Sequence, residues 1–391
     1  MTGFLTPPSD ISDSCSANGI PQHGGNRGWA AAQVGLNSEQ ILDFSASLNP
    51  WGPPVSVIQA LSQAVANPLQ AVGSYPDPES ELLRLELARK HGIPLDWIRV
   101  GNGAAEWITW AARDSAELSQ TLLPVPAFGD YERALSAFGA SILRIRIPFE
   151  QVSLRPLDQW LGPAVDAAIT LSTANRSALW LNNPHNPTGI LWQPQDLLPY
   201  LSAFDLVVVD EAFMDFLPLG SQGEESNSLI PWVADYPQLV VIRSLTKFYT
   251  IPGLRLGYVI AHPDRLRRWQ TWRDPWSVNG LAQVAGIAAL QDHAFQSHTH
   301  QWLAPARQHL ESGLREHLPG WDPLPSAANF LLCRIPGSAT QIQAEWLRRK
   351  GILIRDCSSF PELGHHYIRL GVRTEPEHER LWGDPTSLIT G

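Results

Sequence analysis

The sequence predicts an α/β fold built around a mostly parallel β-sheet, and two observations support that prediction. Short apolar runs alternate along the chain with stretches of helical pattern, which is typical of βαβ units. Several runs are continuous in Val, Leu and Ile, as expected for strands that are covered on both faces. The predicted strands are Trp97–Val100, Thr121–Val125, Ala178–Leu181, Leu206–Val209, Leu239–Ile242, Leu256–Ile260 and Asn329–Cys333.

The clearest helix is predicted over Pro78 to His91. Asp77 can cap it, and Pro78 suits the first position because proline lacks the N–H group that a first turn leaves unbonded. Gly92 is expected to end it. We also expect an exposed loop at the acidic, Gly/Ser-rich stretch Gly220 to Ser228. The apolar face of the helix consists of Leu82, Leu83, Leu85 and Leu87.

Composition predicts a cytoplasmic enzyme of two or three domains. A chain of 391 residues exceeds the usual ~150 residues of one domain. The net charge of −10 argues against nucleic acid as a partner, and no apolar run approaches the ~20 residues of a membrane helix. Cys15, Cys333 and Cys357 are widely spaced thiols typical of a reducing compartment. Met1 to Gln22 is polar, lacks a basic start and is expected to be a flexible lead-in.

Lys247 is the most informative residue, because only three of the 28 basic side chains are lysines. It follows the predicted strand Leu239–Ile242, so its amine projects from a strand end, where desolvation favours the neutral, nucleophilic form. Ser244, Thr246 and Arg255 supply hydroxyls and a guanidinium for a phosphate group. An amine beside phosphate-binding groups predicts a carbonyl cofactor that carries a phosphate. The alternative is a solvated lysine in a Ser/Thr loop.

Three further loops follow predicted strands. Gly103 and Ala104 begin a helix after a Gly-Asn-Gly turn, where bare backbone N–H groups can bind phosphate, although the turn lacks dinucleotide-binding spacing. Asn186 lies in a loop with two Asn-Pro steps, and such a stiff loop can aim its amide at a ligand oxygen. Asp210 ends an apolar strand, where a carboxylate needs a cation such as a protonated pyridine nitrogen. Taken singly, each is also explained as a turn or a cap.

In their order along the chain, these motifs resemble the fold-type I pyridoxal-phosphate enzymes. The order is Gly-Asn-Gly, Asn-Pro-His-Asn-Pro-Thr-Gly, Asp-Glu-Ala-Phe, Ser-Leu-Thr-Lys with Gly-Leu-Arg, and a late Ile-Arg-Leu. Within that superfamily the chain is similar to the branch of threonine-phosphate decarboxylases and histidinol-phosphate aminotransferases. The resemblance implies a central seven-stranded sheet in a large domain over 51–280. An N-terminal arm over 1–50 would join a smaller α+β domain over 281–391.

Carried over residue by residue, the resemblance implies a role for each motif. Lys247 would bind pyridoxal 5'-phosphate as a Schiff base and move the Cα proton, Asp210 would pair with the ring nitrogen, and Asn186 would bond the ring oxygen. Phe128 would stack on the ring. Many relatives have tyrosine where this chain has Phe213. The cofactor phosphate would be held by Gly103, Ala104, Ser244, Thr246 and Arg255, and by Tyr75 across a homodimer interface.

The resemblance also implies the substrate-binding residues. Arg355 and Arg369 match two arginines that grip substrate anions, and a guanidinium suits carboxylate and phosphate alike. His23 and Asn49 lie in an N-terminal segment similar to the one that binds the substrate phosphate in threonine-phosphate decarboxylases. The alternative for His23 is a mobile terminal residue. The other histidines have no companions at metal-ligand spacing, so no metal is expected.

The implied reaction is decarboxylation of O-phospho-L-threonine to (R)-1-amino-2-propanol O-phosphate and CO2, a step of cobalamin biosynthesis. The alternative is a histidinol-phosphate or related aminotransferase that uses 2-oxoglutarate. The outcome depends on which Cα bond is held perpendicular to the cofactor ring, and a sequence does not measure that angle. A non-catalytic regulator that binds the cofactor is a third possibility, but the short acidic N-terminus leaves no room for a DNA-binding domain.

Overall fold

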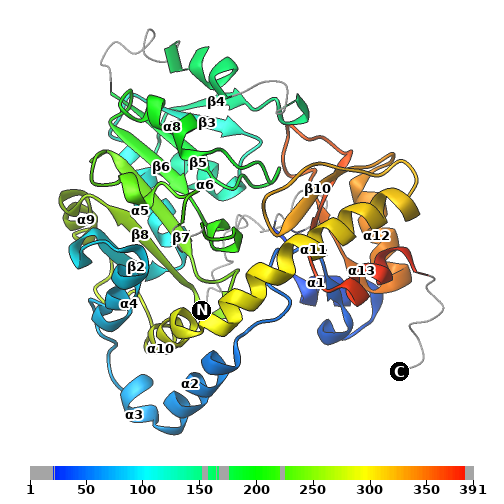
Figure 1. Ribbon diagram of the computed structural model, residues 1–391, viewed down its shortest axis with the longest axis horizontal. Helices are drawn as coiled ribbons and strands as arrows, with labels where there is room; N and C mark the ends of the chain where they lie inside the picture. The colour runs from blue at the N-terminus through cyan, green and yellow to red at the C-terminus, as the bar shows by residue number, and fades with distance from the viewer. Residues whose placement is uncertain are drawn as a thin grey trace, which may run out of the picture.

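The computed structural model describes residues 21, 23–151, 157–163, 165–166, 176–220 and 225–383. Its central element is a seven-stranded sheet in the order β2-β8-β7-β6-β5-β3-β4 (Figure 1). The strands from β7 to β4 run parallel, whereas β8 is antiparallel to both of its neighbours. The strands are β2 Ile98–Asn102, β3 Gln120–Val125, β4 Ile142–Arg146, β5 Ser177–Asn182, β6 Leu206–Asp210, β7 Leu239–Ser244 and β8 Leu256–Ala261.

The mostly parallel α/β sheet predicted from the sequence is confirmed, and its strands are buried on both faces. In β6, Val207 and Val209 belong to one apolar cluster and Val208 belongs to another, because successive side chains of a strand point to opposite faces. One cluster is completed by α4, α8 and α10 and the other by α5, α6 and α9. These helices are α4 Glu81–His91, α5 Ala104–Ser115, α6 Gly129–Ala137, α8 Pro194–Leu201, α9 Pro263–Gln270 and α10 Gly280–Gln291.

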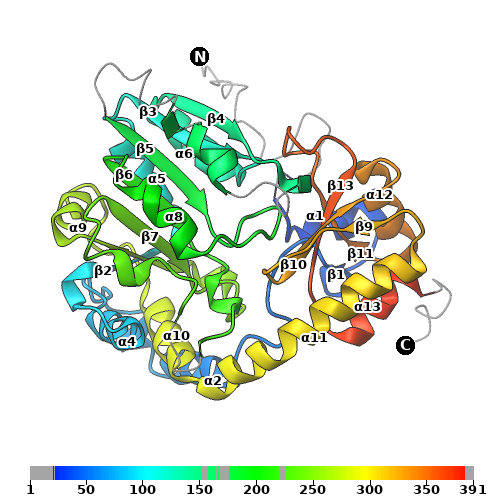
Figure 2. The same cartoon turned by 45° about the horizontal axis from the view of Figure 1, so that its top comes forward.

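The remaining strands form two smaller sheets. An antiparallel sheet has the order β12-β13-β10-β9, and a parallel pair, β1 with β11, joins the N-terminal segment to the C-terminal part of the chain. The long helix α11 extends from the large sheet to the smaller ones (Figure 2). These strands are β1 Leu42–Asp43, β9 Asp322–Pro323, β10 Phe330–Arg334, β11 Ile352–Leu353, β12 Arg355–Asp356 and β13 Tyr367–Gly371. The other helices are α1 Arg27–Val34, α2 Val55–Ala66, α3 Pro68–Ala71, α11 His293–His317, α12 Ala339–Lys350 and α13 Glu375–Trp382.

The predicted helix over Pro78 to His91 begins three residues later than expected. Ser80 is in the left-handed region with φ of 48°, so α4 starts at Glu81. The Asp77 carboxylate still caps the turn, because it accepts hydrogen bonds from the backbone N–H groups of residues 79 and 81. Placing Leu82 on the apolar face was wrong, since it is 68% exposed. Gly92 ends the helix as predicted, with φ of 65°.

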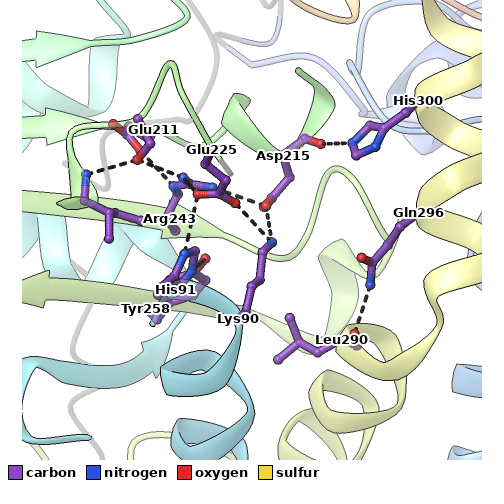
Figure 3. A network of polar contacts seen from close by, with 12 residues as sticks. Lys90, His91, Glu211, Asp215, Glu225, Arg243, Tyr258, Leu290, Gln296 and His300 are labelled. Atoms are coloured by element: carbon purple, nitrogen blue, oxygen red, sulfur yellow. Dashed lines mark hydrogen bonds and ion pairs between the residues drawn. The ribbon is translucent and has the colours of Figure 1, made fainter. Parts of the chain in front are cut away.

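The stretch predicted as an exposed loop, Gly220 to Ser228, is buried at its C-terminal end. Its residues 221–224 lie outside the described part of the chain, as do most of the predicted N-terminal lead-in and Cys15. Ser228 is buried, and the Glu225 carboxylate pairs with Arg243 at 2.5 Å inside a network of charges (Figure 3). The exposed-loop prediction is therefore wrong at this end. Among the described residues, no helix combines the length and apolar character needed to cross a membrane.

Candidate active site

A cavity of about 570 Å³ lies where the loops after β5, β6 and β7 meet the N-terminal and C-terminal segments. In open α/β sheets the carboxyl ends of parallel strands converge at one edge, so residues that follow different strands come together there. The lining includes most of the predicted residues: His23, Phe128, Asn186, Thr246, Lys247, Arg255, Arg355 and Arg369, with Phe213. It also includes Ser45, Asp130, Arg133 and Ser359, which sequence reasoning did not single out.

Lys247 reaches this cavity from the loop after β7. Its Nζ donates to Ser244 Oγ at 3.3 Å and lies 5.3 Å from the centre of the Phe213 ring. Burial lowers the pKa of Lys247 from its ordinary 10.5, Arg255 and Arg369 lower it further, and Asp210 opposes them. The amine therefore has more of its neutral, nucleophilic form than an ordinary surface lysine has.

Asp210 is the buried carboxylate at the end of β6, only 4% exposed. Its Oδ1 accepts from the backbone N–H of Ala212 at 2.9 Å, and its Oδ2 accepts from the Tyr131 hydroxyl at 2.6 Å. Burial raises the pKa of Asp210, while Tyr131 and Lys247 lower it. Tyr131 was missed from the sequence, and the signal that could have found it is its place one helical turn after Phe128.

Asn186 is oriented by Arg369. The arginine Nη1 donates to Asn186 Oδ1 at 2.5 Å, which leaves the amide Nδ2 as the hydrogen-bond donor on the opposite side. The Asn186 backbone N–H donates to Asn182 Oδ1 at 2.6 Å, and Asn182 Nδ2 donates to the Asp210 carbonyl at 2.7 Å. The loop after β5 is thus tied to the end of β6. Burial lowers the pKa of Arg369 to about 10, so its guanidinium is charged at neutral pH.

The N-terminus of α5 and two loop hydroxyls form a cradle for an anion. Ser244 Oγ and Thr246 Oγ1 are hydrogen-bonded at 2.7 Å. Gly103 has φ of 78°, and a Cβ there would come within 2.8 Å of Arg255 Nη2. The guanidinium therefore lies directly against the backbone that precedes Ala104, the first residue of the helix. Backbone N–H groups at a helix N-terminus beside a guanidinium suit a phosphate dianion.

The predicted substrate-binding end of the cavity is basic. Arg355 and Arg369 are paired in register on β12 and β13, and Arg355 Nη2 donates to Ser359 Oγ at 2.6 Å. The His23 ring centre is 5.7 Å from that of Phe128. Burial and the nearby Arg355 lower the pKa of His23, so its imidazole tends toward the neutral form. One further guanidinium, Arg133, lines the cavity and donates to Asp130 at 2.5 Å.

Asn49 and Tyr75 are also absent from the cavity lining, and their side chains make other contacts. Asn49 is 1% exposed, and its Nδ2 donates to the Phe248 carbonyl at 3.0 Å and to Thr299 Oγ1 at 2.8 Å. Its side chain therefore joins the lysine loop to α11 and is not among the residues that line the cavity, so the substrate contact of Asn49 stays a prediction. Tyr75 is 79% exposed and lies against Trp276, with ring centres 4.5 Å apart. A role for Tyr75 across a subunit interface stays a prediction.

These side chains match the chemistry of pyridoxal phosphate. The cofactor presents an aldehyde, a ring nitrogen that carries a proton, a phenolic oxygen and a phosphate. The Lys247 amine and the Asn186 amide line the cavity, and the buried Asp210 carboxylate, which does not line it, interacts electrostatically with Lys247. The cradle at Gly103 and Arg255 suits the phosphate. A Cβ at position 103 would clash with the Arg255 guanidinium, so glycine is what allows the guanidinium to lie against this backbone. The residues present therefore fit this cofactor.

Comparisons with known proteins agree with the geometry. A family model described as aminotransferase class I and II matches residues 33–382. The threonine-phosphate decarboxylase of Salmonella typhimurium is 38% identical over 377 residues, covering 94% of this chain and 97% of that protein. The histidinol-phosphate aminotransferase 2 of Nitrosospira multiformis is 28% identical over 351 residues, covering 89% and 84%.

A solved structure shows the same fold. The L-threonine-O-3-phosphate decarboxylase from Porphyromonas gingivalis superimposes with a TM-score of 0.75 at 24% identity, covering 90% of this chain and all of that one. The family model spans well over half of the chain, including the large sheet, the lysine loop, Arg355 and Arg369. The chain therefore belongs to the class I and II aminotransferase family and is a pyridoxal-phosphate-dependent enzyme.

Proposed function

We propose that this enzyme decarboxylates O-phospho-L-threonine to (R)-1-amino-2-propanol O-phosphate and CO2, as a step of cobalamin biosynthesis. The observation that carries the proposal is the basic lining of the cavity, in which Arg355, Arg369, Arg133 and His23 lie together with Lys247. The 38% identity to a threonine-phosphate decarboxylase over nearly the whole chain supports it.

Charge balance favours a substrate with two anionic groups. O-phospho-L-threonine has a carboxylate and a phosphate that carries about −1.5 to −2 at neutral pH. Three guanidinium groups line the proposed substrate end, and Asp130 is the acidic residue that lines it among the described residues. Arg255 is set apart from them, since it lies against Gly103 at the proposed cofactor phosphate. A substrate of one negative charge would leave this end of the cavity with uncompensated positive charge.

When bound, pyridoxal phosphate supplies an electron sink that stabilises negative charge at the substrate Cα. Asp210 maintains that sink because its buried carboxylate favours a protonated ring nitrogen. Asn186 offers its Nδ2 to the phenolic oxygen while Arg369 holds its Oδ1. The neutral amine of Lys247 can attach the cofactor and afterwards deliver a proton to Cα from the side on which it stands.

We assign to the two arginines on β12 and β13 the choice between breaking the Cα–carboxylate bond and breaking the Cα–H bond. Because Arg355 and Arg369 are paired in register on neighbouring strands, their side chains lie on the same face of the small sheet. Together they could hold the substrate carboxylate and phosphate, and the orientation that they impose would decide whether the carboxylate leaves as CO2. If they instead presented the Cα hydrogen to Lys247, the amine would remove that proton and transamination would follow. This is the second candidate, a histidinol-phosphate or related aminotransferase that uses 2-oxoglutarate, and it is supported by the 28% identical relative.

The two reactions are separated by their products. We expect the purified holoenzyme to release CO2 from O-phospho-L-threonine without any keto acid. Formation of glutamate from histidinol phosphate and 2-oxoglutarate, with no release of CO2 from O-phospho-L-threonine, would assign the chain to the aminotransferases.

We further propose a homodimer, supported by an apolar surface on α2, on α3 and in the loop that follows. A groove of about 480 Å³ between α2, this loop and α10 is lined in part by Tyr75 and Leu82. Monomeric proteins rarely expose so many large apolar side chains together. In the homodimer that the resemblance implies, Tyr75 of a second copy would reach the cofactor phosphate. The exposed residues are Val55, Ile58, Val65, Leu69, Val72 and Tyr75.

The domain division and the location in the cell complete the proposal. We assign residues 51–280 to the cofactor-binding domain, and 1–50 with 281–391 to the smaller one. The β1–β11 pair supports this division, because it joins the N-terminal segment to the C-terminal part. A cytoplasmic location is supported by Cys333 and Cys357, which are free and buried, since reduced thiols suit that compartment.

A further inference from the structure

We propose that Tyr131 is a positioning residue that holds the Asp210 carboxylate ionised and aimed at the cofactor ring nitrogen. The inference rests on pyridoxal-phosphate dependence, and it is independent of whether the enzyme decarboxylates or transaminates. Neither Tyr131 nor Asp210 is among the residues that line the cavity, and the Tyr131 hydroxyl bonds the Asp210 carboxylate, so Tyr131 would act on the cofactor through that carboxylate.

The helix α6 places Tyr131 next to Phe128. Phe128, predicted to stack on the cofactor, is the residue that precedes α6, and Tyr131 lies one turn later on the same helix. The two rings meet edge to face at 5.5 Å and 85°. On its other side Tyr131 packs against Trp180 of β5, with ring centres 5.7 Å apart. The phenol is only 3% exposed, so its hydroxyl has one fixed direction.

The direction of the proton in this contact is determined by chemistry. An ionised carboxylate only accepts hydrogen bonds, so the Tyr131 hydroxyl must donate to Asp210 Oδ2. Burial and the negative charge of Asp210 raise the pKa of Tyr131 well above 10, which keeps that proton on the phenol. The O–O distance of 2.6 Å lies in the range of charge-assisted hydrogen bonds, which are about twice as strong as neutral ones.

Asp210 needs this donor because its surroundings favour the neutral acid. Burial is the largest influence on its pKa and raises it, and the groups that oppose burial are Tyr131, Lys247 and the Ala212 N–H. Once Lys247 is neutral and attached to the cofactor, its contribution disappears. The Tyr131 hydroxyl and one backbone N–H then remain to hold the negative charge that a protonated ring nitrogen requires.

The test uses Tyr131→Phe, which removes one oxygen and keeps the ring. Tyr249→Phe is the matched control, since its phenol is also fully buried and its hydroxyl has no hydrogen-bond partner among the described residues. Holoenzyme is prepared with cofactor labelled with ¹⁵N in the ring, and the ring nitrogen shift is measured by NMR. Cofactor affinity is measured by equilibrium dialysis. We expect Tyr131→Phe to move the shift toward the unprotonated ring and to weaken cofactor binding about tenfold, while Tyr249→Phe changes neither.

A double-mutant cycle separates positioning from a loss of packing. If Tyr131 acts through Asp210, then adding Tyr131→Phe to Asp210→Asn produces no further change in the nitrogen shift. A wild-type shift and wild-type affinity in Tyr131→Phe would overturn the inference, and so would equal effects in both backgrounds. Either result leaves the proposed decarboxylation untouched, because CO2 release is measured separately.

Discussion

Arg369 Nη1 donates a 2.5 Å hydrogen bond to Asn186 Oδ1, so an arginine on β13 orients an amide on the loop after β5. The same guanidinium donates through Nη2 to the Ser45 carbonyl at 3.1 Å. One side chain therefore connects the N-terminal segment, the small sheet and the cofactor-binding loop. The proposed substrate and cofactor sites are coupled through it.

This coupling predicts an unusual result for Arg369→Lys. An ammonium keeps the charge but does not reproduce the planar fork, so Asn186 and the substrate both lose a partner. We expect at least a tenfold rise in KM and, in addition, weaker cofactor binding. Arg334→Lys on β10 is the control, because its surface pair with Asp322 is exposed. Normal cofactor affinity in Arg369→Lys would show that the hydrogen bond to Asn186 has no role in binding the cofactor.

Replacement of Lys247 by Ala is expected to abolish covalent attachment of the cofactor and to lower kcat by at least 10²- to 10⁴-fold, about the contribution of a positioned proton-transfer group. Borohydride reduction of the wild-type holoenzyme followed by peptide mass spectrometry should find the label on Lys247. Lys350→Ala is the matched control, because Lys350 does not line the cavity. Its amine donates to the Leu381 carbonyl at 2.6 Å, at the end of α12. Substantial turnover without Lys247 would contradict the mechanism.

The lowered pKa of Lys247 predicts how the reactivity of its amine depends on pH. Neutral amine is the reactive form, and a pKa below 10.5 means that this form is present at lower pH than in an ordinary lysine. Lys90 provides the opposite case: burial lowers its pKa, but Asp215 and Glu225 raise it more, so the net shift is upward. In the cofactor-free protein, acylation of Lys247 should therefore begin at lower pH than acylation of Lys90. The reverse order, measured by mass spectrometry, would contradict the assignment.

A buried charge network beside the lysine loop predicts a large loss of stability. Arg243 is fully buried and contacts Glu211 at 2.9 Å, Asp215 at 3.2 Å and Glu225 at 2.5 Å (Figure 3). Arg243→Met would leave three carboxylates without this cation, so the free energy of unfolding should fall by about 3–5 kcal/mol. Urea unfolding of the cofactor-saturated protein measures it. Arg334→Met, at the surface, should cost no more than about 1 kcal/mol.

The homodimer is tested at the exposed surface of α2 and α3. A double substitution of Val65→Asp and Leu69→Asp introduces two charges on this surface and should shift the protein from dimer to monomer in light scattering. Phe138→Asp, at the end of α6, is a control on another exposed apolar residue. If Tyr75 reaches the partner's site, the monomer also binds the cofactor more weakly. A monomeric wild-type protein with full cofactor affinity would contradict both proposals.

The sequence predicted the parts of the fold that depend on local patterns. Continuous apolar runs identified the buried strands, and the residues that follow β5, β6 and β7 lie together because parallel strands end at one edge. The strand β4 was missed because it is an edge strand whose two arginines interrupt its apolar run. Leu82 was placed on the buried face because it precedes Leu85 by three residues, which is a helical spacing. It lies in the first turn of α4, which begins at Glu81, and its side chain is exposed.

Long-range partners could not be predicted from the sequence. Asn49 lies in a segment that suggested a substrate contact, yet its amide bonds Thr299, 250 residues away. Glu225 lies in an acidic stretch typical of an exposed loop, but Arg243 draws it into a buried network. The Tyr131 contact with Asp210 spans 79 residues. Such contacts depend on how the elements pack, which no local pattern specifies.

The most direct test of the proposed decarboxylation follows the carboxyl carbon and the Cα position together. Holoenzyme is incubated in deuterium oxide with O-phospho-L-threonine labelled with ¹³C at the carboxylate, without any keto acid, and observed by NMR. We predict that the label appears as CO2 and bicarbonate, and that aminopropanol phosphate carries one deuterium at the former Cα. If the label stays in the substrate carboxylate while the Cα hydrogen exchanges with solvent, Lys247 breaks the C–H bond and the enzyme is an aminotransferase.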